Sequence, residues 1–382
     1  MPRFVPARVG HLVQELSELV PAEDRPRFWE LAHLVENLCH HRAGVMGRLL
    51  GELYAPFDPD AETVPPAAAR EEGLASFEAR LETALAAANF DPVPREVLVT
   101  PGDREVLARL AIDPDLDAVE RLGVWVRGRG TKAVRLRPVR RMFRLQEMEV
   151  ATYRRVVVAV RTRDDPHLTL KLFKDVPERD LELLLPTVRV RMKLFDKLKL
   201  SGSGSAAAIS AWKLLRLAYT YTPGLAKLLA LPFQALLLPL ALLVGGVYGG
   251  KTILDYGKIR ASYVTALAEH LYAITLASNL SVVSRLAELG GEEETKEALL
   301  AYALLLGEGR PGLSAAALQA RAEAWVWDRY RARARFDVQD ALAKLDDLAL
   351  CWRASDGACA VVPLDAALRA VDRAWDELYQ AR

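Results

Sequence analysis

The residues with the most recognisable chemical spacing are Gly245, Gly250, Lys251 and Thr252, which satisfy the phosphate-binding pattern G-x-x-x-x-G-K-[ST]. In that pattern backbone N–H groups surround the phosphates, the lysine reaches the β and γ groups, and the threonine binds Mg²⁺. The context is atypical, because such a loop follows a short buried strand, and here the preceding residues are leucine-rich and contain Pro239. A nucleotide-dependent enzyme is therefore an alternative hypothesis, and no cofactor is predicted.

A second group of residues suggests metal binding. Glu30 and His33 have the Glu-x-x-His spacing of carboxylate-bridged metal bundles, and Cys39, His40 and His41 follow. The partner motif that such bundles need is missing from the sequence. At about 100° per residue, His33 and His40 fall on the polar side of the predicted helix. The sequence therefore predicts no metal site.

A cationic face is predicted shortly before the apolar centre of the chain. Arg189, Arg191 and Lys193 alternate with apolar residues, so on a strand they share one face. We interpret this face as a contact for anionic lipid headgroups, with an ordinary solvated face as the alternative. The segment 201–205 reads Ser-Gly-Ser-Gly-Ser and is interpreted as a hinge, with a phosphate-holding nest of N–H groups as the alternative.

The elements that position these residues follow from the hydrophobic period. Apolar residues between Arg25 and Tyr54 recur at helical spacing, which predicts a long helix with one buried stripe. The stripe consists of Phe28, Leu31, Val35, Leu38, Val45, Leu49 and Leu53. From Leu116 the period becomes that of strands, with the segment 128–130 as the first turn. The sheet is expected to be at least partly antiparallel, because the links are too short for crossover helices.

The longest apolar run extends from Leu228 to Gly250 and contains no charged residue among its 23 residues. At a helical rise of about 1.5 Å per residue, it covers the hydrocarbon thickness of a bilayer. It predicts one transmembrane helix, with a helix buried in a large core as the alternative. The segment from Ala206 to Tyr221 is expected to lie on the membrane surface, or to form a second pass in the alternative hairpin arrangement.

The N-terminal residues and the net charge bear on location and partners. The first twenty residues lack an apolar core of signal-peptide length and contain Glu15 and Glu18. We therefore expect an integral membrane protein with a cytosolic N-terminal domain, in a bacterial inner membrane or, in a eukaryote, in mitochondria. The 51 basic and 50 acidic residues give a net charge of +1, which provides no global field to recruit nucleic acid.

The C-terminal part resembles a winged helix. The expected elements are helices at 292–306, 314–331 and 338–348, a hairpin wing at 350–362 and a last helix at 364–379. A third helix that reads DNA needs cations, and this one carries Asp340, Asp346 and Asp347 beside Lys344. Protein contact is therefore favoured over nucleic acid. The alternative of a tethered nucleic-acid binder rests on four preceding arginines, Arg329, Arg331, Arg333 and Arg335.

The hairpin also bears on the cysteines. With Asp356-Gly357 as a two-residue loop, Cys351 lies opposite Val362 and Cys359 opposite Ala354. The two sulfurs would then point to different faces of the ribbon, so no disulfide between them is expected.

Five segments resemble, in the same order, a family of uncharacterised membrane proteins that includes transmembrane protein 143. They are YAPFDPD (54–60), ANFDPVPREVL (88–98), LKLFKDVPERDLELLLPTVRVRM (170–192), KEALLAYALLL (296–306) and FDVQDALAKLDDLAL (336–350). The resemblance implies a membrane protein, mitochondrial in eukaryotes, with one or two hydrophobic passes after an α+β domain. It implies no catalytic residues.

Taken together, these observations predict a membrane-anchored α+β fold. The expected parts are a helical N-terminal region (1–92), an α+β domain (93–200), a hinge with the surface helix and the transmembrane segment (201–257), and a helical module resembling a winged helix (258–382). The expected function is that of an interaction or structural component at a membrane. The expected partners are the bilayer, anionic headgroups and a protein that the sequence does not identify.

Overall fold

The structure is a computed structural model that describes residues 5–62, 67–94, 110–114, 118–136, 146–184, 188–192, 268–269, 271–309, 312–354 and 357–380. The chain divides into two compact units, which are described separately. The first comprises Met1–Thr100, Asp117–Leu185 and Thr275–Arg382, and the second comprises Pro101–Leu116 and Pro186–Ile274.

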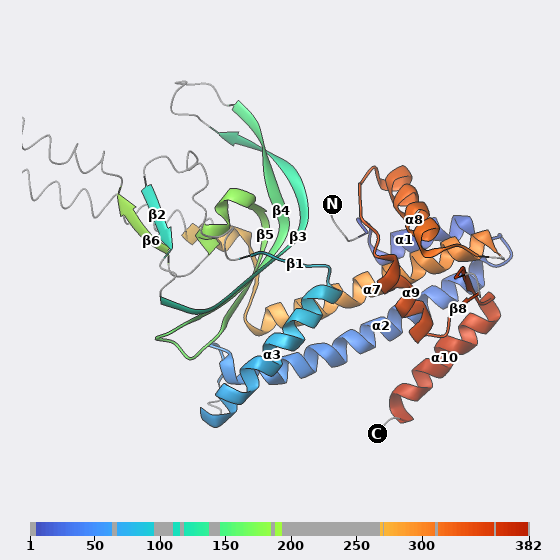
Figure 1. Cartoon of the computed structure of the whole chain (residues 1–382), viewed down its shortest axis with the longest axis horizontal. Coiled ribbons are helices and arrows are strands. Elements are labelled where there is room, and N and C mark those ends of the chain that lie inside the picture. Colours follow the sequence, from blue (N-terminus) through green and yellow to red (C-terminus); the bar gives the residue numbers. More distant parts are fainter. Residues whose placement is uncertain are drawn as a thin grey trace, which may run out of the picture. The chain divides into compact units, whose positions relative to one another are not determined.

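Helices and strands of the described residues are labelled in Figure 1. The α-helices are α1 (Val9–Leu16), α2 (Arg25–Tyr54), α3 (Ala67–Ala87), α7 (Leu280–Glu308), α8 (Ala315–Tyr330), α9 (Val338–Asp347) and α10 (Leu364–Gln380). The strands are β1 (Asp91–Pro92), β2 (Leu110–Pro114), β3 (Val119–Leu136), β4 (Gln146–Thr162), β5 (Thr169–Pro177), β6 (Val188–Met192), β7 (Thr275–Ser278), β8 (Cys351–Arg353) and β9 (Cys359–Val361). Short 3-10 helices are η1 (Ser17–Leu19), η2 (Ala55–Phe57) and η4 (Glu178–Leu184).

The main sheet of the first unit has the strand order β1-β3-β4-β5-β7, and all its neighbouring strands are antiparallel, as the short links predicted. Its longest strands, β3 and β4, form a strongly curved pair (Figure 1). The turn predicted at 128–130 is wrong, because β3 continues through it. Gly128 has φ +71°, but Arg127 pairs with Arg155 and Arg129 with Tyr153, so the same register continues on both sides of the glycine.

Helices α2 and α7 run side by side along the first unit (Figure 1). Their close approach depends on glycines, since a Cβ placed on Gly47 would lie 2.9 Å from the Cβ of Ala287, and one on Gly291 would lie 2.9 Å from the Cβ of Ala43. This contact also corrects the predicted stripe of α2. Its first half is buried as predicted, but Val45 is 45% exposed, because beyond Cys39 the small residues turn toward α7.

A polar contact joins the end of α2 to the sheet and to the start of α7. The hydroxyl of Tyr54 donates to the carbonyl of Leu168 at 2.6 Å and lies 3.3 Å from Oδ1 of Asn279. Asn279, in the left-handed region at φ +52°, also donates from Nδ2 to Asp60 at 2.6 Å. The segment 54–60, which carries one of the quoted resemblances, therefore closes the corner where α2, β5 and α7 meet.

The second half of α7 belongs to a helical module with α8, α9, α10 and the β8–β9 hairpin. Leu313 forms an isolated bridge to Cys359 of the hairpin, with N···O distances of 2.9 and 2.7 Å. The order of helix, bridging strand, two helices and hairpin is that of a winged helix, and we call this part the winged-helix-like module. One apolar cluster unites the module with α1 and the first half of α2.

The predicted register of the hairpin is wrong by one residue. Cys351 pairs with Val361 and Cys359 pairs with Arg353, so the two cysteines lie on the same face of the ribbon rather than on opposite faces. Both cysteines are nevertheless free thiols. The loop closes between Ala354 and Ala358, whose N···O distance is 2.8 Å, and this shifts the pairing by one position.

The prediction of a membrane-anchored fold is corrected. The described part of the chain combines helices with antiparallel sheets, and none of its helices is both long enough and apolar enough to cross a membrane. Its two longest helices, α2 and α7, bury most of their apolar residues against other protein elements. The predicted span (228–250) and surface helix (206–221) lie outside the described residues. The fold is therefore mixed helix and sheet, and the transmembrane assignment and integral-membrane location are withdrawn.

The glycine contact between α2 and α7 gives a prediction for stability. Gly47→Ala should lower the free energy of unfolding, because the new methyl group meets Ala287 on a rigid helix and overpacking costs about 1–3 kcal/mol. Gly44→Ala, on the same helix, should raise it by about 0.5–1 kcal/mol, because the nearest atom to its new Cβ is 3.9 Å away and alanine favours the helix. Urea unfolding of both variants measures this, and equal stabilisation by both would refute the tight contact.

Candidate functional site

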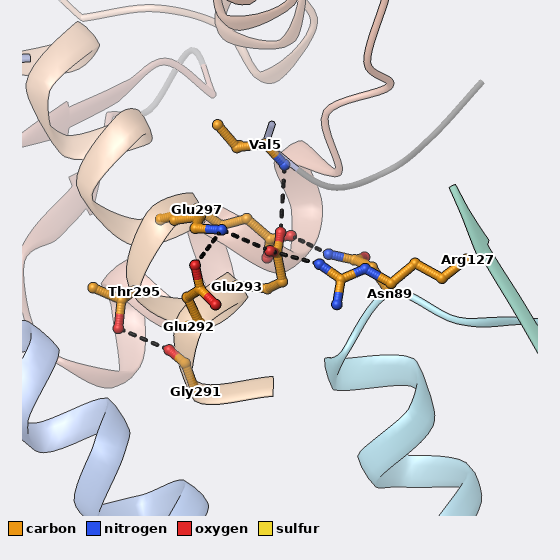
Figure 2. A network of polar contacts seen from close by, with 9 residues as sticks. Val5, Asn89, Arg127, Gly291, Glu292, Glu293, Thr295 and Glu297 are labelled. Carbon is orange, nitrogen blue, oxygen red and sulfur yellow. Dashed lines mark hydrogen bonds and ion pairs between the residues drawn. The ribbon is translucent and has the colours of Figure 1, made fainter. Parts of the chain in front are cut away.

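The middle of α7 carries a cluster of charged residues in the interior of the first unit. Before it, α7 packs with α3 and the sheet through Val282, Val283 and Leu286, and after it Ala298 to Leu305 pack in the winged-helix-like module. The charged residues therefore lie where the two apolar clusters meet. Glu293, Thr295 and Glu297 are at most 1% exposed. We call the buried ion pairs and hydrogen bonds of this part the α7 network (Figure 2).

Glu293 connects α7 with the sheet and with the N-terminal segment. Its Oε1 accepts a hydrogen bond from Nη2 of Arg127 on β3 at 2.8 Å and one from Nζ of Lys296 at 3.0 Å. Its Oε2 lies 3.4 Å from the backbone nitrogen of Val5. Lys296 also pairs with Glu292 at 2.8 Å. Figure 2 shows the Arg127 side chain reaching from its strand to the α7 carboxylates.

Glu297, one turn further along α7, connects α3 with α9. Its Oε1 accepts a hydrogen bond from Nδ2 of Asn89 at 2.8 Å, and its Oε2 pairs with Nζ of Lys344 at 2.5 Å. Asn89 follows the end of α3 in the left-handed region at φ +60°, a conformation that asparagine tolerates better than most residues. Lys344 also binds Asp340 on α9 at 2.7 Å. Both oxygens of the buried carboxylate therefore have a donor.

The pKa values in the network follow from burial and pairing. Loss of solvation raises the pKa of Glu297 to about 7, although the charge of Lys344 and the hydrogen bonds from Lys344 and Asn89 act in the opposite direction. Burial also acts to lower the pKa of Lys344, but the charges of Glu297 and Asp340 outweigh it and raise that pKa. A carboxyl group with a pKa near 7 is suited to proton transfer. Both Glu297 oxygens are occupied and almost unexposed, however, so a structural role is favoured.

Cys39 on α2 is the one described cysteine next to this network. Burial and the charge of Glu294 raise the pKa of its thiol to about 11, with a smaller opposing effect from the hydrogen bond with Thr295. A nucleophilic cysteine needs a lowered pKa and access to solvent. Cys39 therefore acts as a packed side chain between α2 and α7.

The phosphate-site hypothesis is not tested by the structure. Gly245, Gly250, Lys251 and Thr252 lie outside the described residues.

The predicted basic face falls partly on β6 of the second unit. Arg189 and Arg191 share one face of β6, which pairs antiparallel with β2, and their cross-strand partners are Asp113 and Ala111. The lipid contact predicted for this face stays a prediction. Lys193 lies outside the described residues.

The residues that suggested a metal site are separated by the helix. His33 and His40 are exposed, as the helical period predicted, whereas Cys39 is buried. His33 lies 3.8 Å from Glu36 of the same face. Within the described residues, no group of three or more histidine, cysteine, aspartate or glutamate side chains is placed to hold a metal ion.

Sequence reasoning missed the α7 network. A usable signal is the segment 298–306, in which every residue is apolar, so this helix is enclosed on all sides. Charged residues within one turn of such a segment have little access to water and need partners inside the protein. Their partners, Arg127 and Lys344, come from distant positions with no local pattern to mark them.

The raised pKa of Glu297 predicts a pH dependence. The folded protein holds a proton on Glu297 up to about pH 7, whereas the unfolded chain releases it near the ordinary pKa of 4.5. This contribution to the free energy of unfolding is therefore present below pH 4.5 and falls, by up to about 3 kcal/mol, as the pH rises to 7 and above. Glu297→Gln should flatten this part of the stability profile.

Urea unfolding between pH 4.5 and 8 measures the effect, with Glu377→Gln on the exposed side of α10 as the control. The control profile should run parallel to that of the wild type. If the Glu297→Gln profile is also parallel, Glu297 does not titrate in this range.

A comparison with family models finds a match in the middle of the chain. Residues 140–281 match the model of a family described as a protein of unknown function (DUF3754). The matched residues include all of β4, β5, β6 and β7 and the start of α7, and they are less than half of the chain. No solved structure matches the chain. The match supports a domain of unknown function, which is a coarser statement than the resemblance to the transmembrane protein 143 family.

Proposed function

We propose that the protein is an interaction component that contacts another protein through the exposed side of α9 in the winged-helix-like module. The observation that carries this proposal is the charge of α9. In a winged helix the third helix is the one that enters the major groove of DNA, and it needs cations there. Here the exposed side of α9 presents Asp340, Asp346 and Asp347.

The basic residues near α9 form ion pairs with these aspartates. Lys344, the single basic residue of α9, is bound between Glu297 and Asp340. Arg353 of the hairpin lies 2.8 Å from Asp346, and Arg42 of α2 pairs with Asp347. A surface of paired opposite charges has little net potential to attract a polyanion, and it is compatible with a polar protein interface.

Three of the four arginines before α9 also have contacts inside the protein. Arg329 pairs with Glu15 at 3.2 Å and with Glu18 at 3.0 Å. Arg331 lies 3.9 Å from Asp328. Arg333 lies over the ring of Trp327, 5.7 Å from its centroid. Nucleic-acid binding is therefore the weaker candidate for this surface.

We also propose that the protein is related to the family that includes transmembrane protein 143, which is a finer assignment than the matched family model supports. The resemblance to the family that includes transmembrane protein 143 supplies no catalytic residues, and it assigns neither an enzymatic nor an interaction role. The α7 network agrees with an interaction role, since its charged groups join elements of the protein to one another.

The proposal predicts what a photo-crosslinking amino acid at Ala343, on the exposed side of α9, captures in the cells that produce the protein. We expect a discrete adduct that is degraded by protease and unaffected by nuclease. The same amino acid at Glu377, on the exposed side of α10, is the matched control and should give no such adduct. An adduct sensitive to nuclease, or equal capture at both positions, would overturn the proposal.

A further inference from the structure

We propose that a cleft between α3 and β3 binds an ammonium or guanidinium group carried on an apolar stem. This site is separate from the surface of α9 and does not depend on the function proposed for it. The cleft has a volume of about 350 Å³, within the range typical of small-ligand sites. Its lining combines three glutamates and one arginine with the indole of Trp125 and several leucines.

The indole of Trp125, which packs over Gly123, is part of the cleft lining, and we call it the floor. A Cβ at Gly123 would lie 2.1 Å from Cη2 and 2.5 Å from Cζ3 of Trp125, so the six-membered ring covers the Cα of Gly123. Trp125 is half-buried and packs against the apolar cluster that contains Leu81 and Leu168. A larger residue at position 123 would displace the ring. The contact with Gly123 thus fixes the position of an aromatic surface in the lining of the cleft.

The rim of the cleft is acidic. Glu78 and Glu82 extend from α3 and Glu120 from β3, against the single guanidinium of Arg121 among the lining residues. Arg121 lies 3.9 Å from Glu78, and Glu120 pairs with Arg161 at 3.3 Å. Glu82 is exposed and forms no ion pair in the described part of the chain. The lining therefore contains more carboxylates than cations, and this excess of negative charge favours a positively charged ligand.

The floor and the rim together select a particular chemistry. An aromatic face attracts a cation electrostatically, and nearby carboxylates add to this attraction. Leu81, Leu122 and Leu168 offer apolar contacts to the carbon stem that carries the charge. Lysine and arginine side chains have this combination of stem and charged end. A free alkylamine shares the same chemistry.

The test uses the full-length protein and N-acetyl-lysine methylamide as the probe. Binding is followed by the indole N–H signal of Trp125 in NMR spectra, assigned with Trp125→Phe. We expect a saturable shift with the lysine probe, and binding weaker by about tenfold or more for the neutral norleucine analogue. Combined Glu78→Gln and Glu82→Gln should weaken lysine binding to a similar extent, as should high salt. Glu377→Gln is the control and should leave binding unchanged.

Two further probes identify the source of the group. A glycine-serine peptide with one central lysine that binds more tightly than pentylammonium would assign the site to a partner polypeptide, and equal affinity would assign it to a free amine.

Equal binding of the norleucine analogue, no saturable shift at millimolar probe, or binding that is unchanged in the Glu78→Gln, Glu82→Gln variant would overturn the proposal. Gly123→Ala provides an independent check, because it should displace the indole and abolish the response while the acidic rim is intact.

Discussion

The buried carboxylates of Glu293 and Glu297 impose the main constraint on the first unit. Removing a charged group from water costs several kcal/mol unless an opposite charge and hydrogen bonds replace the solvent. Arg127 and Lys296 do this for Glu293, and Lys344 does it for Glu297. Because these partners come from β3, α7 and α9, the sheet and the winged-helix-like module must both be in place before α7 can bury its centre.

Apolar burial and the charged network have different roles in this arrangement. The two apolar clusters on either side of the network provide the driving force for packing, which is non-directional and tolerates sliding of one helix along another. The ion pairs need particular atoms within hydrogen-bonding distance. The contacts of Gly47 and Gly291 fix the distance between α2 and α7 where the two helices pack together. Together they select one register of α7 against α2. The α3–β3 cleft and the surface of α9 are then held at fixed positions on the same unit.

Local patterns predicted local structure well. The helical period placed α2 at its observed bounds, and the short links indicated antiparallel strands. The pattern failed where tertiary contacts decided the outcome. Val45 continues the apolar period of α2 but is exposed, because α7 meets the glycine side of the helix. Gly128-Arg129-Gly130 looks like a turn, yet pairing with β4 carries the strand through it. The partners of Glu293 and Glu297 could not be predicted, since the ion pairs of Glu293 with Arg127 and of Glu297 with Lys344 join residues that no sequence period relates.

The most direct test of this account is a double-mutant cycle between Arg127 and Glu293, with the free energy of unfolding measured by urea denaturation. Arg127→Met alone removes one cationic partner of the buried Glu293 carboxylate. Glu293→Gln alone removes the carboxylate that Arg127 and Lys296 share. Each single change should therefore lower the free energy of unfolding by about 3–5 kcal/mol. The double variant should cost much less than the sum of the two, with a coupling energy of about 2 kcal/mol or more. Additive effects, or single effects below about 1 kcal/mol, would contradict the claim that the α7 network holds the sheet and the winged-helix-like module together.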